Sequence, residues 1–379
     1  MNILIASPYY YPYVSGMTVY AKTLAEGLVK KGHNVCVITT QHEKDLQLNE
    51  TVNNVTIIRV PVAFKFNRGA FSPSFVSNFS KIVDGFDVVN IHAPIFEAGK
   101  LAEVAKKNNK RLIVTYHCDL DMKGALSKIV EKVYYHSIRK ALRSADSIVV
   151  NSMDYMHNSR VKEFSDKAKE IILPIEAKNF RHEKGFKKLY GIPENFEVIG
   201  FLGRITREKG LEYLVSAMPK IFEKRKNALL VIAGEGKKVA GGKKESAKVK
   251  IIKLSKKLGI ENRMIFLGFL HEKNKNKFYS ACDVFVVPSI SSLESFNYTQ
   301  VEAMLCGAPV ITTNLPGVRT VVKRTKAGIV VPIKDSSAIA DAAIEILGNR
   351  KKYIAKRWKL LKFLGVEKSV KEYEALFKI

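Results

Sequence analysis

The sequence contains few cysteines, and their placement excludes two classes of small-domain architecture. They are widely separated and form no C-x-x-C pair, so neither a disulfide framework nor a zinc site with the usual ligand spacing is expected. Each lies in or beside an apolar segment. We predict reduced, mostly buried thiols at Cys36, Cys118, Cys282 and Cys306.

Long apolar runs are also missing. No run reaches the roughly 18 to 20 residues that cross a bilayer. The first expected strand, residues 2–7, begins so close to Met1 that it leaves no room for a signal peptide. We therefore expect a protein that stays in the cytosol.

Acidic residues are scarce relative to basic ones. The 379 residues carry 63 Lys and Arg against 36 Asp and Glu, a net charge of +27, and most of the excess lies in residues 174–379. Such a field favours anionic partners: a nucleoside diphosphate, an acidic membrane surface or nucleic acid. Aromatic residues are not interleaved with the lysines, so we do not expect nucleic-acid binding.

The first half alternates between strand-like and helix-like patterns, which predicts a doubly wound parallel sheet. A helix is expected from Gly16, with a glycine at position 32 to end it. The turn at Gly16 lacks the G-x-G-x-x-G pattern, so a dinucleotide cofactor is not supported. The expected strands are residues 2–7, 35–40, 55–60, 87–92, 111–117 and 146–152.

The strand 111–117 ends at His117, where a parallel strand meets a ligand crevice. An isolated histidine is more often a structural residue than a functional one. Asp119 is a weaker candidate for orienting an acceptor hydroxyl. The helix that follows, 125–142, is expected to be amphipathic with a solvated face. Its apolar positions at helical spacing are Leu126, Ile129, Val130, Val133, Ile138 and Leu142.

Residues 174–186 interrupt the pattern and are predicted to link two domains. The strand 198–202 then leads into a glycine turn and a helix, an arrangement that binds phosphate. Arg204 and Lys209 add two cations at its mouth. The lysine-rich stretch 237–257 is interpreted as a solvated loop entering a helix.

The segment 283–312 is predicted to form a strand, a loop, a short helix and a second strand, with Gly307 placed to end the helix. Two carboxylates, Glu294 and Glu302, flank the start of that helix. Carboxylates there can accept hydrogen bonds from paired sugar hydroxyls, while the helix amides suit an anionic group. A helix cap beside one solvated glutamate is the simpler alternative.

The stretch ESFNYTQVEAMLCGAPVI resembles the signature of the retaining glycosyltransferases of family 4, which have the GT-B fold. The resemblance covers nearly the whole chain. It implies that Glu294 meets the donor sugar and Glu302 the ribose. Where the family has Gly-Phe-Gly, this chain has Ser295, Phe296 and Asn297. Because asparagine tolerates left-handed backbone, we expect the turn to survive.

The resemblance implies further site residues. Gly16 would approach the donor phosphate and His117 the donor sugar. The diphosphate would lie on the turn at Gly203 with its two cations, and two strand ends would frame the nucleoside. The residues carried over are Gly16, His117, Gly203, Arg204, Lys209, Gly234, Glu235, Phe269, Leu270, Phe296 and Asn297.

The resemblance also implies an architecture: two Rossmann-like domains facing across a cleft. Residues 1–173, completed by a C-terminal helix within 357–379, would hold the acceptor, and residues 174–356 the nucleotide sugar. The implied enzyme moves a hexosyl group from a nucleoside diphosphate sugar, UDP or GDP, to a glycan or lipid-linked acceptor with retention. No metal or other cofactor is expected. A nucleotide-sugar epimerase or a non-catalytic nucleotide-sugar sensor are the alternatives.

One loop suggests a membrane surface. Residues 63–71 place Phe64, Phe66 and Phe71 beside Lys65 and Arg68, a mixture suited to lipid headgroup depth. Alternatively, the phenylalanines pack within their domain or line a pocket for a soluble acceptor. The helix that follows is expected to start with a cap at position 72 and to bury its later aromatic residues.

Overall fold

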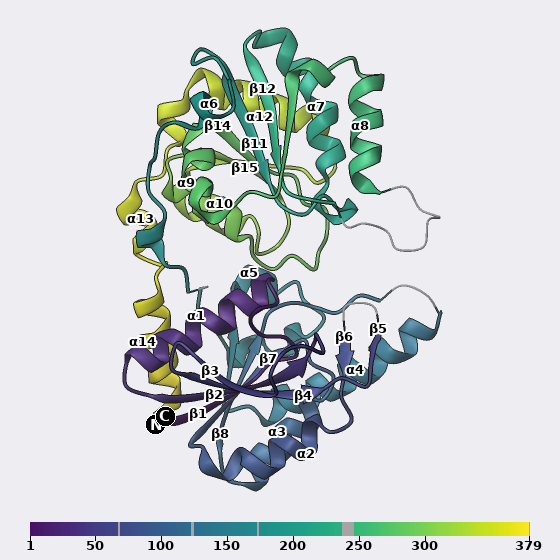
Figure 1. Cartoon of the computed structure of the whole chain (residues 1–379), viewed down its shortest axis with the longest axis vertical. Helices are drawn as coiled ribbons and strands as arrows, with labels where there is room; N and C mark the ends of the chain where they lie inside the picture. The colour runs from purple at the N-terminus through teal and green to yellow at the C-terminus, as the bar shows by residue number, and fades with distance from the viewer. Residues whose placement is uncertain (67–68, 123–124, 173, 237–245, 379) are drawn as a thin grey trace. The chain divides into compact units, whose positions relative to one another are not determined.

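The computed structural model describes residues 1–379 except 67–68, 123–124, 173, 237–245 and 379 (Figure 1). It divides into two compact units, which we call the N-terminal and C-terminal domains. The N-terminal domain comprises Met1–Ile175 with Phe363–Ile379, and the C-terminal domain comprises Glu176–Lys362. No helix among the described residues is both long and apolar enough to cross a membrane.

The N-terminal domain is built on a sheet of eight described strands in the order β10-β9-β8-β7-β1-β2-β4-β3, with β5 and β6 as a separate pair. Only β3 and β4 run antiparallel within the large sheet. The strands are β1 (Asn2–Ala6), β2 (Asn34–Gln41), β3 (Asn49–Val52), β4 (Val55–Pro61), β5 (Phe64–Phe66), β6 (Gly69–Phe71), β7 (Val88–Ala93), β8 (Arg111–Tyr116), β9 (Ser147–Val150) and β10 (Ala168–Glu170).

Helices cover both faces of this sheet (Figure 1), as expected where parallel strands are buried on both sides. Leu4 and Ala6 pack into one apolar cluster with Phe75 and Phe79. The intervening strand positions face the other layer, because side chains alternate along a strand. The helices are α1 (Gly16–Lys30), α2 (Phe75–Ile82), α3 (Ala98–Lys107), α4 (Ala125–Ser144), α5 (Met153–Met156) and α14 (Val366–Phe377).

The last helix, α14, packs against α1 within the N-terminal domain. Gly27 makes the close approach possible: a Cβ there would lie 2.6 Å from Val370 and 2.8 Å from Val366. The hydroxyls of Tyr20 on α1 and Tyr373 on α14 are hydrogen-bonded at 2.8 Å in the buried interface. The end of the chain is therefore an integral part of this domain.

The C-terminal domain is built on a fully parallel sheet of six described strands in the order β13-β12-β11-β14-β15-β16. Helices α7 and α12 pack together over one apolar cluster, whereas α9 and α10 contact β14 (Figure 1). The elements are β11 (Glu197–Leu202), β12 (Ala228–Ala233), β13 (Met264–Gly268), β14 (Cys282–Val287), β15 (Val310–Thr313), β16 (Gly328–Val331), α6 (Phe186–Leu189), α7 (Leu211–Lys224), α8 (Ala247–Lys257), α9 (Glu272–Ala281), α10 (Tyr298–Leu305), α11 (Thr320–Thr325), α12 (Ser336–Gly348) and α13 (Arg357–Leu361).

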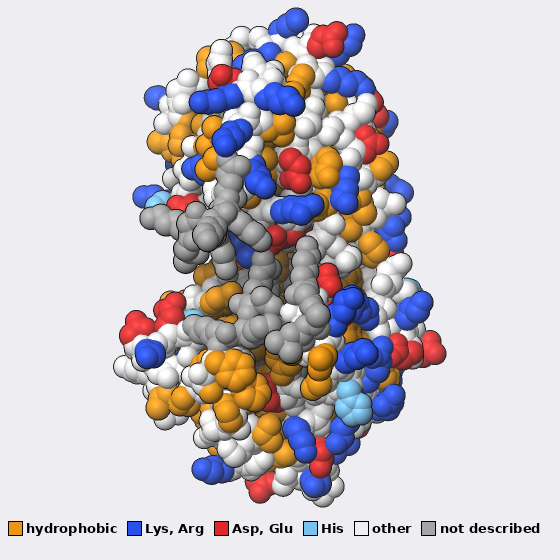
Figure 2. All heavy atoms as spheres, turned by 90° about the vertical axis from the view of Figure 1, so that its right-hand side faces the viewer, with side chains coloured by type: hydrophobic (Ala, Val, Ile, Leu, Met, Phe, Trp, Pro, Cys, Tyr) orange, Lys and Arg blue, Asp and Glu red, His pale blue; other side chains and the backbone are white. Residues whose placement is uncertain are grey.

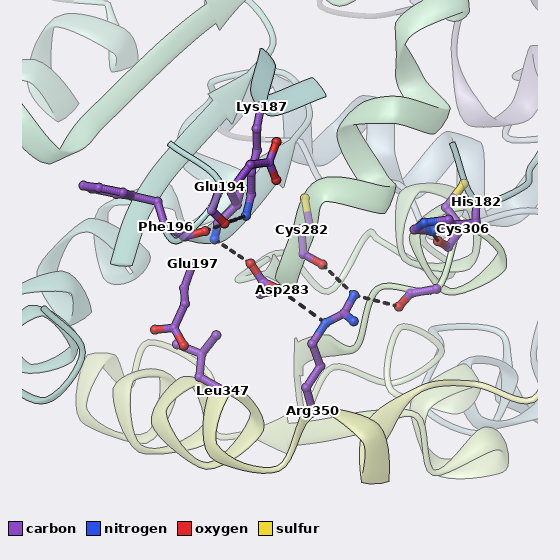
Figure 3. Close-up of polar contacts among 12 residues, drawn as sticks. His182, Lys187, Glu194, Phe196, Glu197, Cys282, Asp283, Cys306, Leu347 and Arg350 are labelled. Atoms are coloured by element: carbon purple, nitrogen blue, oxygen red, sulfur yellow. Dashed lines mark hydrogen bonds and ion pairs between the residues drawn. The ribbon is translucent and has the colours of Figure 1, made fainter. Parts of the chain in front are cut away.

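Charged side chains tie the amino ends of β11 and β14 together (Figure 3). The Asp283 carboxylate accepts a hydrogen bond from the Val198 amide at 2.9 Å and lies 3.5 Å from Nε of Arg350. The same guanidinium donates to the carbonyls of Cys282 at 3.5 Å and Gly307 at 3.3 Å. This cluster lies at the amino ends of the central strands, away from their carboxyl ends.

Several local predictions can now be compared with the structure. All four cysteines are free and three are buried, as predicted, while Cys118 is partly exposed. The predicted cap at Ser72 is wrong, because α2 starts at Phe75 after Ser74, whose side chain makes no capping bond. The lysine-rich stretch lies outside the described residues at 237–245 and continues as α8.

The buried face of α4 also differs from the expectation. Ile138 is buried as predicted, but Ile129 and Val133 are 62% and 63% exposed. Tyr134 and Tyr135 are buried instead. The buried face of α4 thus includes Tyr134, Ile138 and Leu142, and the aliphatic pair lies outside it.

Candidate active site

The strand order of the C-terminal domain predicts where a ligand binds. The chain proceeds from β11 outward through β12 and β13, then returns to the other side of β11 for β14, β15 and β16. In open parallel sheets, ligands bind at the carboxyl ends of the two strands that flank this reversal. These strands are β11 and β14, and the loops that leave them are residues 203–210 and 288–297.

Two glycines let these loops approach one another. Gly210 has a φ of 62°, and a Cβ there would lie 2.1 Å from the Pro288 carbonyl oxygen. Gly234, which follows β12, has a φ of 128°, and its Cβ would lie 1.9 Å from the Gly203 carbonyl oxygen. A side chain at either position would push the loops apart, so both glycines are required by the geometry of the site.

Glu294 and Lys209 meet where these loops converge. Lys209 Nζ donates to Glu294 Oε1 at 2.7 Å, and Asn297 Nδ2 donates to the same oxygen at 2.6 Å. Burial by itself would raise the pKa of the Glu294 carboxyl, but the Lys209 charge and these hydrogen bonds outweigh it and lower that pKa. The site therefore holds a carboxylate and a cation in fixed contact.

Arg204, the second predicted cation, is held differently. Its side chain is 51% exposed, and its ion pair with Glu208 is 3.8 Å long. An exposed pair of this length contributes little to stability. The guanidinium therefore keeps most of its hydrogen-bonding capacity for a ligand.

Asn297 departs from the expected role. Its φ of −126° is extended, so the left-handed turn predicted there is wrong. Instead it caps α10: Asn297 Oδ1 accepts from the Gln300 amide at 3.0 Å, while Nδ2 holds Glu294. The amide side chain supplies two bonds that a glycine at this position would lack.

Glu302 lies on the second turn of α10 in a different polar cluster, with α9. It is 9% exposed, and Tyr279 donates to its Oε2 at 2.6 Å. Burial raises the pKa of the Glu302 carboxyl, opposed by the charge of Lys275 and the Tyr279 hydrogen bond. Tyr279 and Lys275 were not predicted, because nothing in the sequence links α9 to a residue 23 positions away.

The remaining predicted residues of this domain lie after the carboxyl ends of β11, β12, β13 and β14. The Gly203 amide donates to Ala233 at 3.0 Å, and the Glu235 carbonyl accepts from Ile205 at 2.9 Å. After β13, Phe269 is 65% exposed whereas Leu270 is buried. Phe296 is buried in the loop before α10.

In the N-terminal domain, His117 follows β8 and is 5% exposed. Its Nε2 lies 3.0 Å from Nδ1 of His92 on β7, and the edge of the Tyr20 ring packs on it at 4.9 Å between centroids. Burial lowers the pKa of His117 to about 3. The imidazole is therefore neutral near pH 7 and can act only as a neutral donor or acceptor.

A buried hydrogen-bonded chain connects this histidine to α14. Asn90 Nδ2 lies 3.2 Å from His92 Nε2, and Thr115 donates to Asn90 Oδ1 at 2.9 Å. The Thr115 hydroxyl also lies 2.8 Å from the Tyr373 hydroxyl. His92 and Tyr373 were missed because polar residues inside a strand or a helix stripe give no separate sequence signal.

Asp119 is held within the loop after β8. It accepts hydrogen bonds from Tyr116 at 2.6 Å and from the Arg160 amide at 3.1 Å. Asp121 follows it at D-x-D spacing, which sequence reasoning passed over, and lies 3.6 Å from the Arg160 guanidinium. Among the described residues, no group of three or more His, Cys, Asp or Glu is placed to hold a metal ion.

Gly16 is the first residue of α1, after a capping box in which Ser15 and Thr18 bond to each other's amides. The loop proposed for membrane contact lies elsewhere in the same domain. Phe64 is 57% exposed and lines a cavity of about 560 Å³ beside His42. Its ring is tilted by 36° against that of Phe71, with the centroids 4.9 Å apart. Residues 67–68 of that loop lie outside the described residues.

Comparison with known proteins accounts for both domains. A family model described as Glycosyltransferase Family 4 matches residues 14–160, and one described as Glycosyl transferases group 1 matches residues 175–359. An uncharacterized glycosyltransferase of Methanocaldococcus jannaschii is 29% identical over 89% of this chain and 86% of its own. A phosphatidyl-myo-inositol mannosyltransferase of Mycobacterium leprae is 27% identical over 94% of this chain and 90% of its own.

Solved structures resemble the whole chain. Sucrose-phosphate synthase from Thermosynechococcus elongatus has a TM-score of 0.79 at 20% identity, covering 100% of this chain and 98% of its own. Anabaena HepE in complex with UDP has a TM-score of 0.78 at 18% identity, covering all of both chains. The two family matches confirm the family suggested by the Glu294 to Glu302 signature, and these structures show the fold. The chain belongs to the family 4 glycosyltransferases and has the GT-B fold.

Proposed function

We propose that the protein is a retaining, metal-independent glycosyltransferase that uses a nucleoside diphosphate sugar. The observation that carries the proposal is the contact between Glu294 and Lys209 at the carboxyl ends of β11 and β14. A carboxylate there can accept hydrogen bonds from sugar hydroxyls, while the adjacent ammonium can bind the phosphate that links sugar to nucleoside. One donor molecule would engage both groups.

The other residues of this domain suit the rest of the donor. Arg204 would bind the diphosphate with Lys209, and Glu302 would accept from the ribose hydroxyls. The backbone at Gly234 and Glu235 and the segment at Phe269 and Leu270 would frame the base. Structures of Anabaena HepE contain UDP and UDP-glucose, which supports UDP as the nucleotide, with GDP as the alternative.

The proposed chemistry depends on stabilising the departing diphosphate. Negative charge grows on its oxygens as the sugar bond breaks, and preorganised cations and amides lower the energy of that state. Lys209, Arg204 and the amide of Gly16 would supply this stabilisation without a metal ion. Neutral His117 would contact the donor sugar. The acceptor hydroxyl would attack the sugar from the face that the diphosphate leaves, and the leaving phosphate would accept the proton of that hydroxyl.

The acceptor is proposed to be a glycan or a lipid-linked molecule that the N-terminal domain holds, with Asp119 orienting its hydroxyl. The Mycobacterium leprae relative is named a phosphatidyl-myo-inositol mannosyltransferase, which supports a lipid-linked acceptor. Work at the cytoplasmic face of a membrane stays a prediction. Attachment through Phe64, Phe66 and Phe71 stays a prediction.

The test is transfer from UDP and GDP sugars to candidate acceptors, followed by NMR of the product anomer. We expect a retained configuration and unchanged turnover in excess EDTA. An inverted product would contradict the front-face mechanism, and loss of activity in EDTA that magnesium or manganese restores would contradict metal independence. Turnover of the nucleotide sugar without any acceptor would indicate an epimerase.

A further inference from the structure

A basic pocket lies in the N-terminal domain, on a surface with no role in the donor chemistry proposed above. It is a cavity of about 430 Å³ between α4 and the segment that follows α5. Its volume lies within the range of about 300 to 1,000 Å³ that is typical of small-molecule sites. The residues that matter for its chemistry are Lys132, Tyr135, His136, Arg139, Arg143 and Arg160.

Two of the arginines are held in place around one ring. The guanidinium groups of Arg139 and Arg160 each lie 5.4 Å from the centroid of Tyr135, which is 6% exposed. Arg139 Nε donates to Glu163 at 2.7 Å, and its Nη2 donates to the Arg160 carbonyl at 2.8 Å. Arg160 pairs with Glu131. Their positions are therefore set before any ligand arrives, which lowers the entropy cost of binding.

Two further cations, Lys132 and Arg143, lie on the same helix, and the charge of Arg143 acts on the Glu163 carboxylate. Among the described residues, neither Lys132 nor Arg143 forms an ion pair within 4.0 Å, and both are exposed on α4. Glu131 is the acidic residue of the lining, and two further carboxylates, Glu163 and Asp121, contact Arg139 and Arg160 from beside it. Arg139 and Arg160 are largely neutralised by these carboxylates, so the hydrogen-bond donors left for an anion are mainly those of Lys132 and Arg143.

The pocket is bonded to the loop after His117. Tyr135 both donates to the Leu120 carbonyl and accepts from its amide at 3.0 Å, and Glu131 accepts from the Met122 amide at 3.1 Å. The Arg160 amide donates to Asp119, the proposed acceptor residue. A ligand in this pocket would therefore lie beside the loop that is proposed to orient the acceptor.

Exposed apolar side chains lie on the same helix. Ile129 and Val133 are one turn apart, and both are more than 60% exposed. On the molecular face toward which α4 extends, Lys and Arg side chains are interspersed with acidic and apolar ones (Figure 2). Apolar residues next to cations occur where a helix meets a lipid interface. A phosphate bound here could thus belong to a lipid headgroup or to a soluble molecule.

We propose that this pocket binds a phosphate group carried by the acceptor. The proposal rests on the glycosyltransferase function proposed above and names one chemical feature of its acceptor. A phosphate offers negatively charged acceptor oxygens to guanidinium and ammonium donors, whereas the oxygens of a neutral glycan carry no charge. The pocket would hold the phosphate while the acceptor hydroxyl is presented near Asp119.

The test compares wild type with Lys132→Gln/Arg143→Gln, in which neutral side chains replace the two exposed cations. Lys31→Gln/Lys81→Gln is the control, because it removes the same charge from exposed positions of the same domain. One arm titrates glycerol 3-phosphate and inorganic phosphate by calorimetry. The other measures sedimentation with phosphatidylcholine vesicles, with and without phosphatidylglycerol. UDP binding is measured for every variant.

We expect the pocket variant to lose at least about tenfold in affinity, and the control less than about threefold, in one of the two arms. Loss with the soluble phosphates identifies a soluble acceptor, and loss with the anionic vesicles identifies a lipid headgroup. Absence of binding in both arms, or equal loss in the control, overturns the proposal. If the pocket proposal fails while wild type still binds UDP, the glycosyltransferase proposal stays intact. If wild type does not bind UDP, the result counts against the glycosyltransferase proposal, whatever the two phosphate arms show.

Discussion

Replacing Lys209 by methionine should destabilise the C-terminal domain through Glu294. The two charges are 2.7 Å apart, and their side chains are only 20% and 12% exposed. Breaking a fully buried ion pair costs about 3 to 5 kcal/mol, and the residual exposure reduces our expectation to about 2 kcal/mol. The Asn297 hydrogen bond remains and prevents a larger loss.

The pH dependence should change sign in the same variant. In wild type the pKa of Glu294 is lowered, so its contribution to stability is present above the unfolded pKa and is lost as pH falls through the folded pKa. Without Lys209, burial dominates and raises that pKa. In the variant, the folded protein then favours the protonated carboxyl. Its contribution to stability is complete below the unfolded pKa and is lost as pH rises through the raised folded pKa. The stability difference between wild type and Lys209→Met should therefore widen from about pH 4 to pH 7.

Urea unfolding across this pH range is the assay, and Arg204→Met is the matched control. Arg204 is 51% exposed, so its loss should change stability by less than about 0.5 kcal/mol. Both variants should nevertheless lower turnover by roughly 100- to 1,000-fold. In a double-mutant cycle with Glu294→Gln, we expect a coupling energy of about 1 to 2 kcal/mol. Additive effects, or a stability difference independent of pH, would refute the reasoning.

Three further outcomes follow from the geometry. Glu302→Ala should weaken UDP binding by about 1.5 to 3 kcal/mol in calorimetry, and an unchanged affinity would remove the ribose assignment. Arg350→Ala should lower the urea midpoint by leaving Asp283 without its cation, yet keep nucleotide affinity; a loss of affinity would show that the cluster reaches the site. His117, with its pKa of about 3, should make wild type lose about 1.3 kcal/mol of stability between pH 7 and 5.5 as the unfolded chain takes up the proton. An equal loss in His117→Gln would contradict this.

The order of elements followed from local sequence because alternating apolar patterns and glycine turns are local features. Helix α10 contains Val301 and Met304 and ends at Leu305, shortly before Gly307, as their pattern indicated. The positions of Glu294 and Lys209 near strand ends were also predictable. Their contact was not, since 85 residues separate them and only the sheet order brings their loops together.

Predictions failed where tertiary contacts decide between local options. Asn297 could adopt a left-handed turn or cap a helix, and the nearby Glu294 and Gln300 favour the cap. Ile129 and Val133 are exposed whereas Tyr134 and Tyr135 are buried, and helical spacing alone does not tell which of these side chains face the core. The partner of Glu302 on α9 depends on helix packing, which a motif does not encode.

The most direct measurement is calorimetric titration of wild type, Lys209→Met and Arg350→Ala with UDP and GDP in excess EDTA. The account predicts that wild type and Arg350→Ala bind one of the two nucleotides with similar affinity, and that Lys209→Met binds it at least about tenfold more weakly. Absence of binding to either nucleotide in wild type, or equal affinity in Lys209→Met, would contradict the claim that the carboxyl ends of β11 and β14 form a nucleotide-sugar site.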